Sequence, residues 1–295
     1  MALFPLAPPA VEPVSLCELK EYLRVDPDDT SQDGVITALG MGARAWVEGF
    51  LNRRCVQQTW RLMMDFFPGY IDLKLSGQRV SSPFVSGSNA VLVGIRYAIV
   101  LPFPPVQSIV AFVYQDANGD VTEMDPATDY VTDIQSNPAR LTPPFGSMWP
   151  VARVVVNAVQ IDYQLGYASP LTVSVGGSPP VPTQLAASGY TFQPADIGRP
   201  ISIQGAGVNG GTLNTVIAGI SSPPDTNATL RDPMQSGIQN AQALLVNAPY
   251  CNPQHWELIK SAIKIHVEGV WRRISPDIYL KQAKLVCYPA RDERW

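Results

Sequence analysis

The chain has little of what metal proteins and most hydrolytic enzymes depend on. It has two histidines, His255 and His266, whose spacing of eleven positions does not suit a metal pair on one helix face. Its four cysteines are Cys17, Cys55, Cys251 and Cys287, and they form no Cys-x-x-Cys pair. We therefore expect reduced, mostly buried thiols and no structural zinc.

Catalytic motifs are also missing. The chain contains no Gly-x-Ser-x-Gly elbow, no His-Glu-x-x-His and no Walker loop. Residues 205–210 satisfy Gly-x-Gly-x-x-Gly, but β-branched residues follow, so we predict a strand there rather than the helix that a dinucleotide site needs. Residues 116–120 are typical of an Asn-Gly hairpin turn. Read as a calcium loop, the run has Val121 at the sixth position, where glycine is needed, and no distal glutamate. We expect no enzyme activity, no cofactor and no metal.

Long apolar runs are absent as well. The longest, such as Ile109–Tyr114, have strand length and fall far short of a membrane span. The N-terminus has no basic region before its apolar residues, and its prolines break any signal-like helix, so we expect the protein to stay where it is made. We predict an irregular arm over residues 1–13.

Charge is scarce and unevenly spread. Charged residues make up 16% of the 295 positions against 46% hydrophobic ones, a globular composition with room for more than one domain. The net charge is −4, yet residues 249–295 hold eight Lys and Arg against five Asp and Glu. An acidic body with a basic C-terminal part argues against a sequence-reading DNA-binding protein.

The clearest positive signal is a pair of amphipathic helices over residues 15–54. Ser15 and Glu18 have the spacing of a capping box, in which each side chain bonds the backbone of the other residue. Apolar residues at helical spacing predict the buried faces of both helices, including Leu19, Leu23, Leu39, Trp46 and Phe50.

Residues 56–167 favour antiparallel strands. Alternation is clear at residues 60–64 and 70–75, and a Gly/Ser-rich stretch over 76–97 indicates an added loop or hairpin. Residues 171–246 have no lysine or glutamate and are rich in Gly, Ser, Pro and Thr. We interpret residues 168–248 as an inserted small all-β domain on a surface connection, and expect its removal to leave the remainder folded.

A closing helix is predicted over residues 253–275, with Pro253 at its first position and Trp256, Ile263 and Trp271 on its apolar face. Ser275-Pro276 is expected to stop it. Residues 276–295 are then predicted to form a basic tail that reaches away from the body and carries aromatic and basic contact residues: Tyr279, Lys281, Lys284, Tyr288, Arg291, Arg294 and Trp295.

Six segments occur in an order that resembles the head–tail connector (adaptor) proteins of tailed bacteriophages: "VSLCELKEYLRVDPDD…ITALGMGARAWVEGFLNRRCVQQTW", "LPFPPVQSIVAFVYQDANGDV", "DYVTD", "GSMWP", "VQIDYQLGY" and "LIKSAIKIHVEGVWRRI". The resemblance covers residues 14–75, 98–167 and 249–275, and no single motif within it is diagnostic. Within the insert, "FQPADIGRPISIQGAG" and "LNTVIAGISSPPDTNATL" look like a β module of phage tail-fibre and other virion proteins.

The resemblance implies an α+β fold: a helical hairpin and closing helix packed with an antiparallel β region, interrupted by the small all-β domain. It also implies a structural protein of the virion neck, assembled in the host bacterial cytoplasm as a homo-oligomeric ring, most often of twelve copies. The implied partners are the portal, a tail-completion, terminator or neck protein, and genomic DNA that passes through the channel without sequence-specific binding. The C-terminal tail would be the portal-docking arm. The alternative is a tail or decoration protein whose β insert binds a surface glycan or host receptor.

Overall fold

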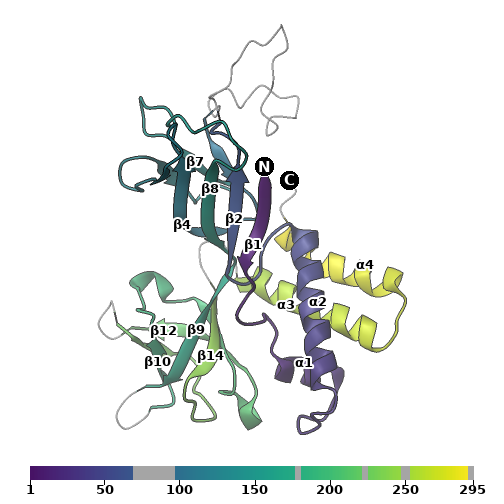
Figure 1. Ribbon diagram of the computed structural model, residues 1–295. Helices are drawn as coiled ribbons and strands as arrows, with labels where there is room; N and C mark the ends of the chain where they lie inside the picture. Colours follow the sequence, from purple (N-terminus) through teal and green to yellow (C-terminus); the bar gives the residue numbers. More distant parts are fainter. Residues whose placement is uncertain (69–96, 177–180, 221–224, 247–252, 292–295) are drawn as a thin grey trace. The chain divides into compact units, whose positions relative to one another are not determined.

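A computed structural model describes residues 1–68, 97–176, 181–220, 225–246 and 253–291 (Figure 1). The chain divides into two compact units. The first, the strand unit, holds residues 1–8 and 58–165, and the second holds residues 9–57 and 166–295. This division joins the helices to the inserted strands, whereas the sequence-based grouping joined the helices to residues 56–167.

The strand unit contains two antiparallel sheets. The larger has the order β1-β2-β8-β4-β5, from β1 (Ala2–Ala7), β2 (Gln58–Met64), β8 (Val159–Leu165), β4 (Val106–Gln115) and β5 (Val121–Glu123). The smaller has the order β3-β7-β6, from β3 (Ile99–Leu101), β7 (Ala139–Thr142) and β6 (Val131–Asp133). Strand β8 lies between β2 and β4 and alternates strictly, burying Val159, Ile161, Tyr163 and Leu165. These side chains form the centre of the unit's core.

The prediction of an irregular arm at the N-terminus was wrong. Residues 2–7 form strand β1, which pairs with β2 at the edge of the sheet. Pro5 removes a backbone donor, but an edge strand tolerates this because one side of it has no neighbouring strand. The register shifts between Pro5 and Ala7, as a bulge at the edge allows.

The hairpin predicted at residues 116–120 is confirmed. Strands β4 and β5 pair antiparallel up to Gln115 and Val121. The Asp116 carboxylate accepts hydrogen bonds from the backbone amides of Asn118, Gly119 and Asp120, and Gly119 has a positive φ of 98°. The Asp116 carboxylate therefore stabilises the turn itself.

The second unit begins with helices α1 (Leu16–Leu23) and α2 (Asp33–Leu51). The predicted capping box is confirmed: the Glu18 amide donates to Ser15 Oγ, and the Ser15 amide donates to Glu18 Oε2. Lys20 Nζ holds the turn between the helices by donating to the carbonyls of Pro27 and Asp29 at 3.1 and 2.9 Å. Helix α3 (Pro253–Trp271) comes from the far end of the chain and packs on both.

Six strands close into an antiparallel barrel in the order β10-β13-β12-β11-β14-β9. The strands are β9 (Ala168–Val175), β10 (Gln184–Ser188), β11 (Pro200–Ile203), β12 (Leu213–Gly219), β13 (Asn227–Leu230) and β14 (Ala241–Val246). The short turns η2 (Pro194–Asp196) and η3 (Val208–Gly210) lie between strands. After the Gly-x-Gly-x-x-Gly run the chain enters strand β12, which confirms the predicted strand.

The prediction that residues 276–295 form an extended tail was wrong. Residues 276–287 form helix α4 (Pro276–Cys287), followed by the turn η4 (Tyr288–Ala290). Ser275-Pro276 begins this helix, because proline at a first-turn position needs no amide hydrogen. Helix α3 ends at Trp271 rather than at residue 275. Ala283, Cys287 and Ala290 lie in the helical core, so this segment is part of the body.

Several predictions lie outside the described residues: the strand at 70–75, most of the loop at 76–97, Cys251, Arg294 and Trp295. None of the helices in the described part of the chain combines the length and apolar content that a membrane crossing requires.

Candidate functional site

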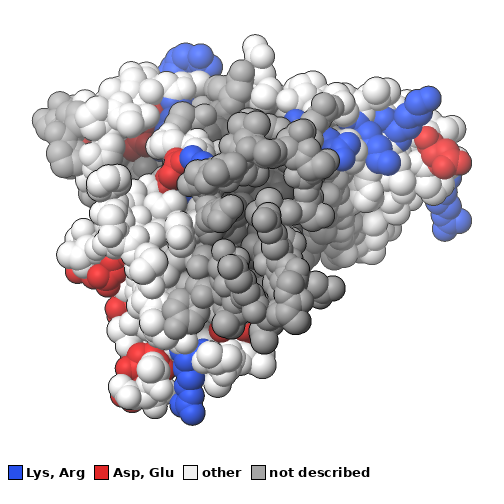
Figure 2. All heavy atoms as spheres, turned by 90° about the horizontal axis from the view of Figure 1, so that it is seen from above, with Lys and Arg blue, Asp and Glu red and all other residues white. Residues whose placement is uncertain are grey.

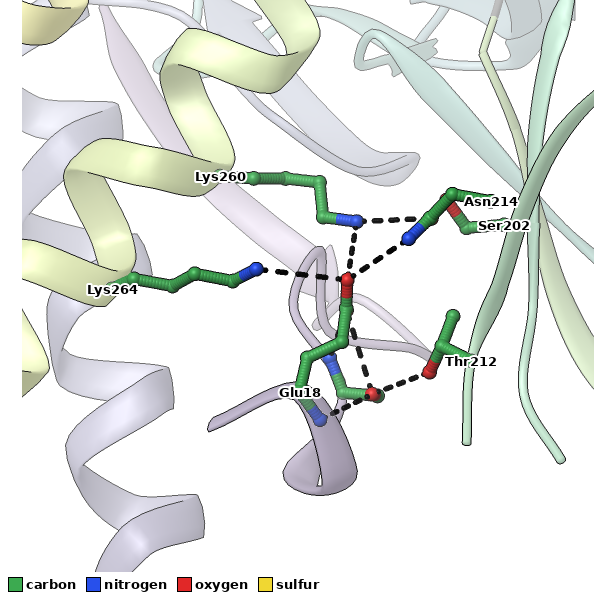
Figure 3. Close-up of polar contacts among 7 residues, drawn as sticks. Glu18, Ser202, Thr212, Asn214, Lys260 and Lys264 are labelled. Carbon is green, nitrogen blue, oxygen red and sulfur yellow. Dashed lines mark hydrogen bonds and ion pairs between the residues drawn. The ribbon is translucent and has the colours of Figure 1, made fainter. Parts of the chain in front are cut away.

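Two features of the second unit are candidates for function: a buried polar cluster between the helices and the barrel, and the outer surface of helix α4. The cluster is centred on Glu18, which is 8% exposed, and on Lys260 of α3, which is 1% exposed (Figure 3). Lys260 Nζ lies 2.7 Å from Glu18 Oε1 and 3.1 Å from Asn214 Oδ1 of strand β12. Buried charges of this kind need a partner of opposite charge and satisfied hydrogen bonds.

The barrel supplies the remaining partners of the cluster. Asn214 Nδ2 donates to Glu18 Oε1 at 3.3 Å, and Ser202 Oγ donates to Asn214 Oδ1 at 2.6 Å. The hydroxyls of Ser15 and Thr212 lie 2.7 Å apart. The same carboxylate therefore caps helix α1, pairs with helix α3 and contacts the barrel.

Electrostatics keep Glu18 ionised in this setting. Burial raises the pKa of Glu18. The charge of the Lys260 ammonium, the hydrogen bond that Lys260 donates and the hydrogen bond from the Ser15 amide together lower it by more, so the pKa lies below the ordinary value. Lys264 adds a second positive charge, 3.8 Å from Glu18 Oε1. The residues around the cluster give it a structural role, namely holding two helices and the barrel together.

Apolar contacts join the barrel to the helices beside this cluster. Leu244 and Val246 of β14 and Ala168 of β9 belong to the same core cluster as the helices. The expectation that residues 171–246 are peripheral therefore does not match the contacts. Sequence spacing could not reveal this, because the contacts join residues about two hundred positions apart.

The predicted helix-core residues all lie on the helical core. Leu19, Leu23, Trp256 and Ile263 are buried within it, and Leu39, Trp46, Phe50 and Trp271 are half-buried against it. The rings of Trp46 and Phe50 stack in parallel with centroids 5.9 Å apart. The ring of Trp46 also lies against the imidazole of His266, with centroids 5.1 Å apart. Burial lowers the pKa of His266.

The residues predicted for a docking tail separate into inner and outer sets. Tyr279 is buried, and its ring lies against the imidazole of His266 with centroids 5.3 Å apart. The same ring lies so close to Gly269 that a Cβ added there would be 2.2 Å from it. Lys281, Lys284, Tyr288 and Arg291 are exposed. Together with exposed Ile278 and Leu285, these four form what we call the α4 surface.

The α4 surface is basic and partly fixed in place. Lys284 Nζ and Arg291 Cζ lie 5.8 and 4.7 Å from the centroid of the Phe50 ring, as cation–π contacts require. Arg272 and Arg273, at the end of helix α3, are also exposed. Figure 2 shows Lys and Arg side chains gathered over the part of the molecule that α3 and α4 occupy in Figure 1. This arrangement can bind an acidic surface of a partner protein.

Across the described ranges, no three His, Cys, Asp or Glu side chains lie close enough together to hold a metal ion. The thiols of Cys55 and Cys287 are buried, and burial raises the pKa of the Cys287 thiol to about 11.

No family model matches the chain, and no curated protein matches it. Solved structures resemble part of it. A chain in the structure described as the virion of a native gene transfer agent (GTA) particle aligns at 16% identity and a TM-score of 0.40, covering 57% of this chain and 72% of that one. A chain in the neck of an empty GTA particle, computed with C6 symmetry, aligns at 18% identity, a TM-score of 0.39 and the same coverage. A chain in the neck of a native GTA particle, computed with C12 symmetry, aligns at 17% identity and a TM-score of 0.37, covering 57% and 70%. These values are too low to assign a family.

Proposed function

We propose that the chain is a structural, non-enzymatic head–tail connector of a tailed phage or phage-like particle. In this proposal, twelve copies form a ring in the virion neck beneath the portal. The ring joins the capsid to the tail, and the genome passes through its channel without sequence-specific contacts.

One observation carries the proposal: helices from both ends of the chain share one core, and antiparallel strands followed by a closed barrel occupy the sequence between them. The resemblance in residues 14–75, 98–167 and 249–275 implies this layout of paired helices, antiparallel strands and a closing helix. Helices α1 and α2, strands β2 to β8 and helix α3 fit this order, whereas strand β1 and helix α4 are additional to it.

The α4 surface is the proposed contact to the portal. It lies on a packed helix, so little conformational freedom is lost when a partner binds. Its lysines and arginine favour an acidic partner surface, and exposed Leu285 and Tyr288 add apolar contact area.

The oligomeric state tests the ring. The purified protein, alone and mixed with the portal protein of the same particle, is examined by native mass spectrometry and negative-stain imaging. We expect a closed ring of twelve copies, formed alone or on the portal. A protein that stays monomeric at all concentrations and does not bind the portal would contradict the proposal.

A further inference from the structure

Helix α2 exposes an uncharged face. Its outward-facing residues are small or apolar, and none carries a charge; we call the following six the α2 face: Val35, Ala38, Met41, Gly42, Ala45 and Gly49. A Cβ added at Gly42 or Gly49 would meet nothing within 4 Å. Because a solvent-facing helix side normally carries charged residues, this face is typical of a surface that another molecule covers.

The charged residues beyond the first turn of α2 are turned inward. Arg44 Nε contacts Glu12 Oε2 at 2.7 Å, and Arg44 Nη1 contacts Glu48 Oε2 at 2.9 Å. Glu48 Oε1 also accepts from the amide of Cys55 at 2.9 Å. The helix thus pairs its inward-facing charges in an ion network beside its buried apolar face, while its exposed side carries small or apolar residues.

A second, largely apolar surface lies in the strand unit, on the connection between β7 and β8, where Arg153 is the one charged residue. Residues 143–156, here called the apolar loop, expose six large apolar side chains: Phe145, Met148, Val151, Val154, Val155 and Val156. Phe145 is 107% exposed and Val154 is 90% exposed, values that equal or approach those of an extended peptide.

The apolar loop is nevertheless fixed at several points. Trp149 stacks on Phe67 with centroids 5.2 Å apart, and its Nε1 donates to the carbonyl of Tyr97 at 2.6 Å. Further along, the Arg153 amide donates to the Gln115 carbonyl at 2.9 Å. The loop therefore presents its apolar side chains from a defined backbone, as a preformed contact surface does.

We propose that the apolar loop of one copy docks on the α2 face of a second copy. Large projecting side chains on the apolar loop fit small residues on the α2 face, and Arg153 is the single charged residue of the two surfaces, so little hydration of charge is lost in the contact. Because the two surfaces differ, the contact is heterologous, and contacts of this type build rings. The inference rests on the proposed ring and assigns the residues of its subunit interface.

The test uses one charged substitution on each surface. Ala45→Arg places a charge on the α2 face, and Val154→Arg places one on the apolar loop. Both positions are exposed, so we expect unchanged circular dichroism and thermal midpoints in the unassembled protein. Each variant should raise the concentration needed for half-assembly by roughly 100-fold or more, because it buries an unpaired charge in the interface. Val208→Arg, at an exposed valine of the barrel, is the matched control and should assemble as the wild type does.

Mixing the two variants identifies which surface meets which. Ala45→Arg keeps an intact loop and Val154→Arg keeps an intact α2 face, so an equimolar mixture should form a one-to-one heterodimer that native mass spectrometry detects. Wild-type assembly by both variants, or no heterodimer in the mixture, overturns the interface while the wild-type ring still stands. A wild type that remains monomeric, alone and with the portal, overturns the ring and the interface together.

Discussion

The carboxylate of Glu18 lies 2.7 Å from the ammonium of Lys260, although 242 positions separate the two residues in the chain. Glu18 belongs to the first helix and Lys260 to the third, and Asn214 of the barrel bonds to both. The pair therefore joins three parts of the second unit, and the stability of each part depends on the others.

Replacing Lys260 with Met should strongly destabilise the protein. The substitution leaves the Glu18 carboxylate buried without its main counter-charge, at an expected loss of about 3–5 kcal/mol in the free energy of unfolding. Urea titration followed by circular dichroism measures this loss. Lys281→Met, at an exposed lysine of α4, should leave the midpoint unchanged. The double variant Glu18→Gln/Lys260→Met should lose less than the sum of the two single variants, and simple additivity would contradict direct coupling.

The same pair predicts how stability depends on pH. The pKa of Glu18 in the folded protein lies below its ordinary value of 4.5, so folding favours the ionised form. The stabilisation is complete above pH 4.5 and is lost as the pH falls through the lower folded pKa. Glu18→Gln keeps the capping spacing but does not titrate, so its free energy of unfolding should fall less than that of the wild type between pH 5 and pH 2. Parallel pH profiles for the two proteins would be evidence against this role.

Gly269→Ala should destabilise the protein, although alanine usually favours a helix. A Cβ at this position would lie 2.2 Å from the Tyr279 ring, so α4 would have to move away from α3. We expect a loss of about 1–3 kcal/mol, as is usual for overpacking. Gly42→Ala, on the open side of α2, is the matched control and should stabilise the unassembled protein by about 0.5–1 kcal/mol. Thermal unfolding compares the two, and equal stabilisation would show that α3 and α4 are not packed this closely.

Portal binding should depend on the charge of the α4 surface. Lys281→Glu/Lys284→Glu reverses two exposed charges and should weaken binding to purified portal, and wild-type binding should itself weaken as salt rises. Arg231→Glu, at an exposed barrel position, is the control. Surface plasmon resonance at several salt concentrations gives the affinities. Wild-type affinity in the double variant would exclude the α4 surface as the portal contact.

Removal of the barrel should unfold the helices or lower their thermal stability. Replacing residues 171–246 with a Gly/Ser linker removes Leu244, Val246 and Asn214, which contact the helical core and the buried ion pair. We expect a lower thermal midpoint and increased binding of a hydrophobic dye. A deletion variant as stable as the wild type would restore the view of the barrel as a peripheral insert.

Local features could be predicted from the sequence, and long-range ones could not. The Ser15–Glu18 spacing indicated a capping box because both partners lie within one helical turn. Nothing in that spacing indicated that Glu18 also pairs with Lys260, since a buried ion pair has no fixed separation along the chain. Helix α4 was missed for a different reason. Its buried residues Tyr279, Ala283 and Cys287 recur every four positions, but alanine and cysteine give a weak apolar pattern. Pro276 fits the start of a helix as well as its stop.

Because the helical core joins the two ends of the chain, the order of protein synthesis matters. Roughly two hundred residues separate the end of α2 from the start of α3, which takes on the order of 10–40 seconds to translate. During that interval the nascent helices α1 and α2 have no α3 to cover their apolar faces, while the contiguous barrel strands emerge and can close. We therefore expect the apolar faces of α1 and α2 to stay exposed on the ribosome until α3 emerges, for a time set by the translation of residues 52–252.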